Sequence, residues 1–237
     1  MIHLHQLPKL PGKNYSCSPF CVKLELYLKA MNIPYDNNFS FELNKSPTGK
    51  MPFIQTRGKK IADSNIIIKY LEQENGQLLD SHLSCQQSAV SLAFIRLCED
   101  SLYWTAVYSR WVDVDNKSWK KEFIASTKLP KMMSGIVYNA AKRNITRQLK
   151  ASGMLALTQR EIYSKSEQDL KALADFLNGR KHFFNDNVSL LDITVYSFIV
   201  QLLDDCCSKR YQSILEGLNF SDFIDNMKKF SNFENNS

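Results

Sequence analysis

The sequence Gly49-Lys50-Met51-Pro52-Phe53-Ile54, followed by Ile61-Ala62-Asp63-Ser64-Asn65-Ile66-Ile67, organises the first third of the chain. Pro52 precedes a short β-branched and aromatic run. This places it at the start of a strand, where its missing N–H costs no ladder hydrogen bond. The bond before a proline is also the one peptide bond that adopts the cis form at small cost. A cis bond here would leave the main-chain N–H and C=O of Met51 turned outward.

The second half of this region predicts a turn and the start of a helix. Residues 57–59 would turn the chain back into a second strand, and Asp63 with Ser64 would then cap a helix that continues through Leu71. The region thus gathers an unpaired main-chain amide and carbonyl, a helix N-terminus, and a carboxylate beside a hydroxyl. These groups suit a ligand that carries both an α-carboxylate and an α-ammonium group.

The composition is that of an ordinary globular protein. Hydrophobic residues make up 44% and charged residues 23% of the 237 residues, which excludes global disorder and allows one large domain or two modest ones. The net charge of +6 is mildly basic, but the lysines are spread along the chain and form no dense block with aromatic residues. We therefore expect solvated helix faces rather than a nucleic-acid partner or binding to a membrane surface.

The cysteines and the first residues of the chain indicate in which cellular compartment we expect the protein. The six cysteines are Cys17, Cys21, Cys85, Cys98, Cys206 and Cys207. An even number does not by itself predict disulfide bonds in a chain of this length. The chain starts without the basic and apolar segments of a secretory signal, and it has no run of about eighteen apolar residues. We expect a soluble protein of a reducing compartment, the cytoplasm, with no membrane span.

The residues before the central region predict a βαβ unit. Residues 2–7 alternate apolar and polar, as a half-buried strand does, and Ser18-Pro19 opens a helix with a cap residue followed by proline. Apolar side chains from Cys21 onward recur at helical spacing and form one buried stripe. A second strand is expected over 35–41. Together with the central region, this order gives a mixed four-stranded sheet with helices on its faces.

The later part of the chain predicts only helices. Strand patterns nearly vanish after 74–77, so we expect an α/β domain over 1–76 and an all-helical domain over 77–237. Ser189 and Asp192 form a capping box at the start of the most apolar helix. We expect each of these two residues to contribute about 1 kcal/mol to stability.

Several of these motifs resemble the glutathione transferase superfamily. The proline-opened first helix with cysteines near it, Lys50-Met51-Pro52, Asp63-Ser64, and the late box of Ser189 and Asp192 occur in the order and spacing of that family. The resemblance covers nearly the whole chain. It implies a thioredoxin-like N-terminal domain joined to an all-helical C-terminal domain.

Three further segments are most similar to one branch of the superfamily, the metaxin and failed-axon-connections branch. These segments are residues 18–25, 110–113 and 160–163. Because that branch includes proteins that act in assembly and import, the resemblance brings a non-catalytic function into consideration.

The resemblance also implies which residues bind glutathione. Met51, held by Pro52, would pair its main chain with the cysteinyl part of the tripeptide. Asp63 and Ser64 would bind the γ-glutamyl end, and Lys50 could reach the glycyl carboxylate. The alternatives are that Ser64 serves only as a helix cap and that Lys50 is a solvated loop lysine.

In the superfamily, the group that stabilises the thiolate of glutathione lies between the first strand and the first helix. Ser18 stands where glutaredoxin-like and omega-like relatives have a nucleophilic cysteine. This departure argues against thiol-transferase activity and leaves a hydroxyl-donor mechanism open. Cys17 and Tyr15 are the other candidates. At a helix N-terminus, the thiol of Cys17 would be partly ionised and reactive, and the alternative is a loop cysteine with no role.

Two functions follow from the resemblance, and Cys17 leaves a third open, that of a redox protein. The first is a glutathione transferase that binds glutathione and transfers it to a small electrophile in detoxification. The second is a non-catalytic protein of metaxin type that keeps the fold for binding or interaction. The resemblance leaves the electrophile unidentified and a homodimer open, and no metal site is expected from the spacing of the cysteines and histidines.

Overall fold

The N-terminal domain is a mixed four-stranded sheet in the order β2-β1-β3-β4. The computed structural model describes residues 1–127, 129–184, 187–204 and 207–231, apart from the side chain of Lys131. The strands are β1 (Ile2–Gln6), β2 (Tyr35–Phe39), β3 (Phe53–Thr56) and β4 (Lys59–Ala62). β1 runs parallel to β2 and antiparallel to β3, and β3 runs antiparallel to β4, as the predicted βαβ and ββα units require.

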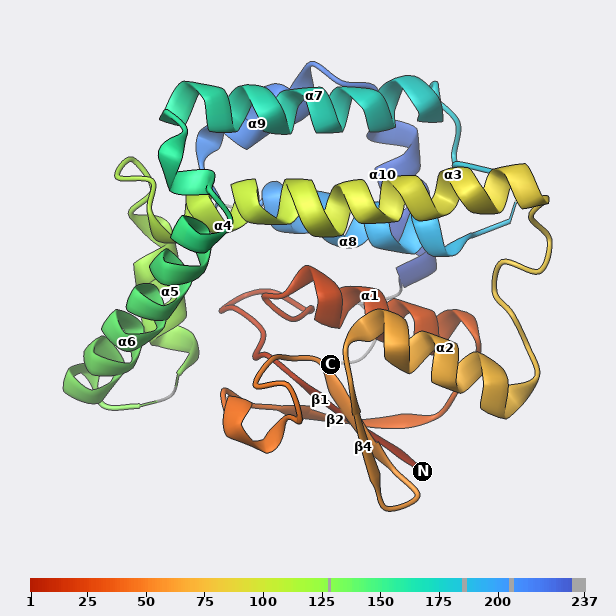
Figure 1. Ribbon diagram of the computed structural model, residues 1–237, viewed down its shortest axis with the longest axis horizontal. Coiled ribbons are helices and arrows are strands. Elements are labelled where there is room, and N and C mark those ends of the chain that lie inside the picture. The colour runs from red at the N-terminus through yellow and green to blue at the C-terminus, as the bar shows by residue number, and fades with distance from the viewer. Residues whose placement is uncertain (128, 185–186, 205–206, 232–237) are drawn as a thin grey trace.

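Two helices, α1 (Pro19–Ala30) and α2 (Ser64–Asn75), pack on the same face of this sheet (Figure 1). The segment before β3 contains only the short 3₁₀ helix η1 (Leu43–Lys45). The prediction of helices on both faces is therefore corrected, because residues 40–52 supply no helix long enough to cover the second face.

The C-terminal domain consists of helices. They are α3 (Cys85–Arg96), the π-helix η2 (Leu97–Leu102), α4 (Tyr103–Trp111), α5 (Ser118–Ser126), α6 (Lys131–Ala151), the 3₁₀ helix η3 (Met154–Ala156), α7 (Gln159–Leu177), α8 (Leu190–Leu202), α9 (Lys209–Glu216) and α10 (Ser221–Ser231). In the described residues, no helix is both long and apolar enough to cross a bilayer. The division at residue 76 stays a prediction. The α/β sheet followed by a helical bundle is the fold class that the sequence predicts.

Helix α8 lies at the centre of the helical domain and packs against α1, α3 and α10 (Figure 1). Its capping box is formed as predicted, and Ser189 Oγ accepts from the main chain of Asp192. Asp192 does more than close the box: its buried carboxylate accepts from the Ser189 main-chain N–H within the box and also from the main-chain N–H of Phe183, each at 2.8 Å. We therefore expect the loss of Asp192 to cost more than the loss of Ser189, since it leaves buried donors unpaired.

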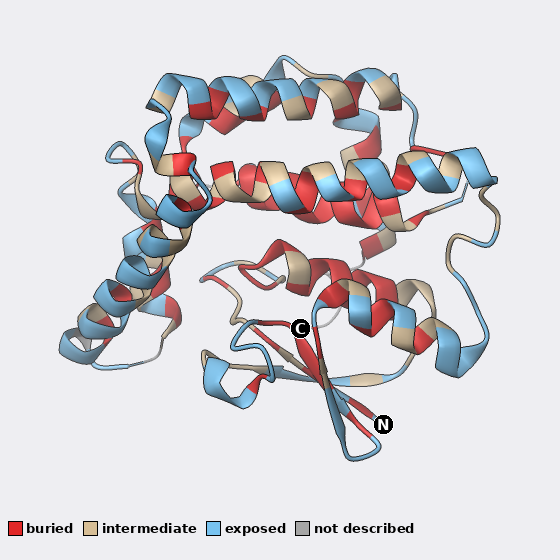
Figure 2. Ribbon diagram, in the orientation of Figure 1, coloured by how far each residue is buried: buried red, intermediate tan, exposed pale blue. Residues whose placement is uncertain are grey.

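Helix α1 is buried on two sides, whereas the sequence predicts a single buried stripe (Figure 2). Leu24 and Leu28 belong to the core between α1 and the sheet, while Val22 and Leu26 belong to the core that α1 shares with α8. Periodicity alone does not detect the second face, because the helix that covers it lies more than 150 residues later in the sequence.

The double burial of α1 encloses a lysine. Lys23 has no exposed side-chain surface, and its Nζ lies 2.7 Å from a carboxylate oxygen of Glu99 in η2. Nζ also donates to the side chain of Asn65 in the first turn of α2 at 2.5 Å, and Asn65 donates to Glu99 at 2.7 Å. Burial lowers the pKa of Lys23, and the adjacent carboxylate opposes that shift. This triad joins both domains at the start of α2.

We predict that Glu99→Gln lowers the free energy of unfolding by about 3 kcal/mol, because it leaves the Lys23 charge buried without a counter-charge. The double variant Lys23→Met, Glu99→Leu should cost far less, since it buries no charge. Urea denaturation measures both values. The matched control is Asp175→Asn, which removes an exposed partner of Lys171 and should change stability by less than about 0.5 kcal/mol. A Glu99→Gln effect as small as that of the control would contradict the assignment.

Candidate ligand site at the start of helix α2

The bond between Met51 and Pro52 is cis, the form that the sequence allows at this position. β3 begins one residue later, and its first pair with β4 joins Phe53 to Ala62. Continuing the antiparallel register brings the Met51-Pro52 bond opposite Asp63 and Ser64. Over the described parts of the chain, neither the N–H nor the C=O of Met51 has a hydrogen-bond partner. A pair of main-chain groups is therefore available beside the N-terminus of α2.

Asp63 caps α2 in an unusual backbone conformation. Its φ is 77°, a region that residues with a side chain seldom adopt and that recurs at ligand sites. One carboxylate oxygen, Oδ1, accepts from the main-chain N–H groups of Asn65 at 2.9 Å and Ile66 at 3.2 Å. The residue is exposed, so its carboxylate can also meet a ligand.

Ser64 is buried, and its hydroxyl is unsatisfied. In the part of the chain that the structure describes, Oγ has no hydrogen-bond partner and almost no exposed surface. The alternative that Ser64 is the cap of α2 is not what the structure shows, because Asp63 performs that function. A buried hydroxyl without a partner is costly. A rotation about its Cα–Cβ bond could turn it toward a ligand at the helix N-terminus.

The loop before α1 places Ser18 beside Cys21. Ser18 occupies the cap position of α1, but its side chain does not cap the helix. Burial raises the pKa of the Cys21 thiol to about 11, partly offset by hydrogen bonds with the Leu7 main chain and with the hydroxyls of Ser18 and Ser16. The Cys21 side chain packs with Met51, in the same cluster as Ala62. Ser18 is therefore near the residues that lead into the ligand site, and Cys21 is a buried thiol, as the sequence suggests.

Cys17 is packed against the helical domain. It packs in an apolar cluster with Trp119, Phe123 and Tyr138 of the helical domain. Burial raises the pKa of its thiol to about 12, and the nearby Arg110 guanidinium offsets only part of this rise. The structure therefore favours a packed cysteine over the reactive thiolate that one interpretation of the sequence allows.

Tyr15 is also directed toward the helical domain. Its hydroxyl donates to the Asp204 carboxylate at 3.0 Å, and the same carboxylate forms an ion pair with Lys13. These contacts hold the loop against α8 and engage the phenol in a structural hydrogen bond. Among the three candidates for the thiolate-stabilising group, only Ser18 has a side chain in contact with a residue that packs on Met51.

Two residues that the sequence did not single out hold this loop in place. Arg110 donates to the Cys17 carbonyl at 2.8 Å, and Gln201 donates to the Ser16 carbonyl at 2.7 Å. The two side chains also bond each other at 2.6 Å, and Arg110 stacks on the Trp119 ring. Arg110 belongs to a segment noted for its resemblance to the metaxin branch, but nothing in the spacing indicates that it reaches the loop before α1.

Lys50 is exposed, and its carbonyl accepts from Ser46 Oγ at 2.6 Å. Its ammonium group is thus able to reach either solvent or a ligand. The alternative of a solvated loop lysine stays open.

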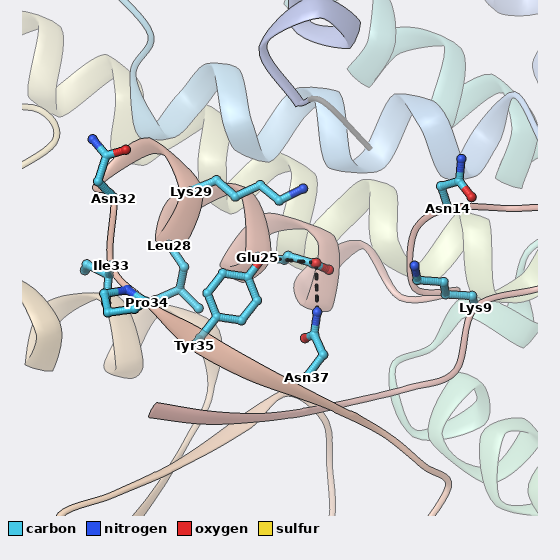
Figure 3. Close-up of a pocket in the computed structure, with 10 residues that line it drawn as sticks. All are labelled: Lys9, Asn14, Glu25, Leu28, Lys29, Asn32, Ile33, Pro34, Tyr35 and Asn37. Atoms are coloured by element: carbon cyan, nitrogen blue, oxygen red, sulfur yellow. Dashed lines mark hydrogen bonds between the residues drawn. The ribbon is translucent and has the colours of Figure 1, made fainter. Parts of the chain in front are cut away.

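Two hollows on the described surface lie away from the candidate site. One, of about 630 Å³, lies beside α1 and β2, where the buried Glu25 carboxylate accepts from Tyr35 and Asn37, each at 3.1 Å (Figure 3). The other, of about 550 Å³, lies beside His3 and His5. Neither is lined by Met51 or Ser64. The candidate site is defined by main-chain groups and a helix N-terminus.

Family models match most of both domains. The glutathione S-transferase N-terminal domain matches residues 19–118, and the glutathione S-transferase C-terminal domain matches residues 166–227. A solved glutathione S-transferase of Ceriporiopsis subvermispora, in complex with glutathione, covers 98% of this chain and 97% of its own at 17% identity, with a TM-score of 0.63. That structure shows the shared fold.

Three curated proteins are similar to this chain over more than two thirds of its length, and they identify its family. The isoprene-epoxide glutathione S-transferase of Rhodococcus is 32% identical over 79% of this chain and 81% of its own. Failed axon connections of Drosophila melanogaster is 32% identical over 85% of this chain, and mouse metaxin-1 is 30% identical over 73%. This chain spans 50% of the former and 57% of the latter. The chain belongs to the glutathione S-transferase family, and its relatives include the branch that the sequence motifs resemble.

We predict that iodoacetamide at neutral pH modifies Cys85, which is exposed at the start of α3, at least about a hundredfold faster than Cys17 or Cys21. Burial hides both slow thiols and keeps them protonated. Mass spectrometry of the labelled peptides gives the rates, and labelling in urea, where all three should react alike, is the control. Modification of native Cys17 as fast as Cys85 would restore it as a reactive thiol.

Proposed function

We propose that this protein binds glutathione beside Met51 and the N-terminus of α2, and transfers it to a small electrophile. The observation that carries the proposal is the unpaired main chain of Met51 opposite an unsatisfied Ser64 hydroxyl, in a chain of the glutathione S-transferase family. The positive end of α2 favours a carboxylate at this position. The cytoplasm as location and detoxification as purpose are parts of the same proposal.

Each end of the tripeptide has a partner in this arrangement. The N–H and C=O of Met51 would pair with the cysteinyl unit, as an added strand pairs with a sheet edge. The γ-glutamyl carboxylate would accept from the α2 N-terminus and the Ser64 hydroxyl, while Asp63 would accept from the ammonium group. Lys50 would bind the glycyl carboxylate. Pro52 fixes the position of Met51 relative to α2.

Ser18 is the proposed donor to the sulfur. Its hydroxyl would stabilise the thiolate, which is the nucleophile, by donating a hydrogen bond. With an epoxide, the class of substrate named for the Rhodococcus relative, the sulfur forms a bond to carbon, the carbon–oxygen bond of the ring breaks, and the alkoxide takes a proton from water. Tyr15 and Cys17 are weaker candidates, because their side chains face the helical domain.

A non-catalytic function of metaxin type is the second candidate. Ser18 is largely buried and its hydroxyl already faces the thiol of Cys21, which limits its approach to a bound sulfur. The similarity to metaxin-1 and Failed axon connections supports the same alternative. In that case the protein would keep the glutathione site, or only the fold, as a means of interaction.

Calorimetric titration with glutathione tests the binding site. We expect Ser64→Ala to weaken binding about tenfold, since it removes one donor to a charged group. The variant should not lower the free energy of unfolding, because Oγ has no partner in the described protein. Ser197→Ala removes a buried hydroxyl in α8 and should leave the affinity unchanged. The site is wrong if wild-type protein shows no binding, or if the two variants bind alike.

Turnover with a small epoxide separates the two functions. We expect Ser18→Ala to lower kcat at least about a hundredfold, the usual cost of losing one donor to a developing anion. Cys17→Ala and Tyr15→Phe should lower it only a few-fold, once their stability has been checked. Glutathione binding without turnover in the wild type would assign the protein to the non-catalytic alternative. A rate that survives in Ser18→Ala but not in Tyr15→Phe would transfer the role to Tyr15.

A further inference from the structure

The positive charge of this chain is concentrated in the segment that forms the hairpin of α5 and α6. Residues 117–150 contain nine Lys and Arg side chains and a single acidic one, Glu122. Their net charge of +8 exceeds the +6 of the whole chain, so the remainder is slightly negative. Helix α6 itself carries five basic residues and no acidic residue.

One side of α6 is packed and the opposite side is open. Ser134, Tyr138 and Leu149 are buried where α6 meets α4, α5 and η3. With about 3.6 residues per turn, Ile136 and Arg143 fall on the opposite face, and both are exposed. Figure 2 shows most of α6 as exposed, on a hairpin that projects beside the N-terminal domain.

The open face changes character along the helix. Exposed apolar side chains gather around its first two turns, with these exposed fractions: Leu129 (two residues before the helix) 42%, Met132 81%, Met133 52%, Ile136 66% and Val137 36%. Its last turns are basic, with exposed Arg143, Arg147 and Lys150. Exposed apolar side chains that are contiguous and bordered by charges mark an interaction surface, whereas single ones do not.

We propose that this face of α6 binds the surface of a membrane that contains anionic phospholipids. The apolar side chains at the start of α6 enter the boundary between headgroups and acyl chains. Arg143, Arg147 and Lys150 bind the negatively charged headgroups. A helix with an apolar segment, a basic segment and no acidic residue has the composition of helices that lie in the plane of the membrane interface. The expectation of solvated faces, drawn from the scattered lysines, is thereby replaced for α6.

Charge and apolarity together favour a lipid surface over other partners. A nucleic acid would match the basic residues, but it offers no apolar phase for Met132 and Ile136. A second copy of this chain, docked through the same helix, would offer apolar contacts but no counter-charge from α6 for Arg143 and Arg147, because α6 carries no acidic residue. An anionic bilayer supplies both the hydrocarbon and the negative charge.

Sedimentation with vesicles tests the proposal on the full chain. Vesicles of phosphatidylcholine with about one third phosphatidylserine should bind the protein, and pure phosphatidylcholine vesicles should bind it at least about tenfold more weakly. Salt at about 0.5 M should weaken the binding, since it screens the headgroup attraction.

Variants assign the binding to α6. The triple variant Arg143→Gln, Arg147→Gln, Lys150→Gln should bind anionic vesicles about a hundredfold more weakly, given a roughly fivefold contribution from each basic residue. Met132→Gln with Ile136→Gln should weaken binding about tenfold at unchanged charge. All five side chains are exposed, so unfolding curves should match the wild type.

The control variants remove basic and apolar side chains from other parts of the surface. Lys59→Gln, Lys69→Gln, Lys209→Gln lowers the net charge equally on β4, α2 and α9, and Leu92→Gln removes a 57% exposed apolar side chain on α3. Both controls should bind vesicles like the wild type. The proposal is overturned if the protein does not bind anionic vesicles, or if the control triple variant loses as much vesicle affinity as the α6 triple variant. It is also overturned if the protein binds duplex DNA but not vesicles, or if it forms a homodimer in solution that the α6 variants dissociate.

Discussion

The carbonyl groups of Ser16 and Cys17 are bonded to side chains of the other domain, and the arrangement of the candidate site depends on this contact. Gln201 in α8 and Arg110 in α4 each use one donor for the loop, and they bond each other as well. Buried carbonyls need such partners, because they have exchanged water for protein. The loop before α1 is therefore held by the helical domain, and the N-terminal domain alone lacks these partners.

This contact determines which of the three candidate side chains is available to the sulfur of a bound glutathione. The loop is fixed with Cys17 packed into an apolar cluster and with the Tyr15 hydroxyl on Asp204. Ser18, one residue further, is the candidate that adjoins the residues around Met51. The second interdomain contact, from Lys23 to Glu99, reaches Asn65 and so supports the first turn of α2 next to Ser64. Both sides of the candidate site are thus braced by the helical domain.

Much of the fold follows from local sequence, because proline, glycine and capping residues act within a few positions. The order of strands and helices in the first domain, the helix that starts after Asp63 and the capping box at Ser189 are predicted from such signals, which also allow the cis bond before Pro52. The long-range features are not. The second buried face of α1 depends on α8, which periodicity in α1 cannot reveal.

For the candidate site, too, the local features were predicted from the sequence and the long-range contacts were not. The residues around Met51 and Asp63 carry local signals, and the family resemblance connects them. The burial of Lys23 has no local signal, because its partner Glu99 comes from the other domain, and the reactivity of Cys17 depends on burial by aromatic residues from α5 and α6. The exposure of the basic and apolar residues of α6 likewise depends on which side of the helix is packed, which the sequence alone does not show.

A crystal structure of the protein with bound glutathione tests the central claim most directly. The account predicts the cysteinyl unit paired with the main chain of Met51, the γ-glutamyl carboxylate about 3 Å from Ser64, and the sulfur nearest to Ser18. Glutathione bound in the hollow beside Glu25, or bound with the groups around Met51 and Ser64 unoccupied, would contradict it.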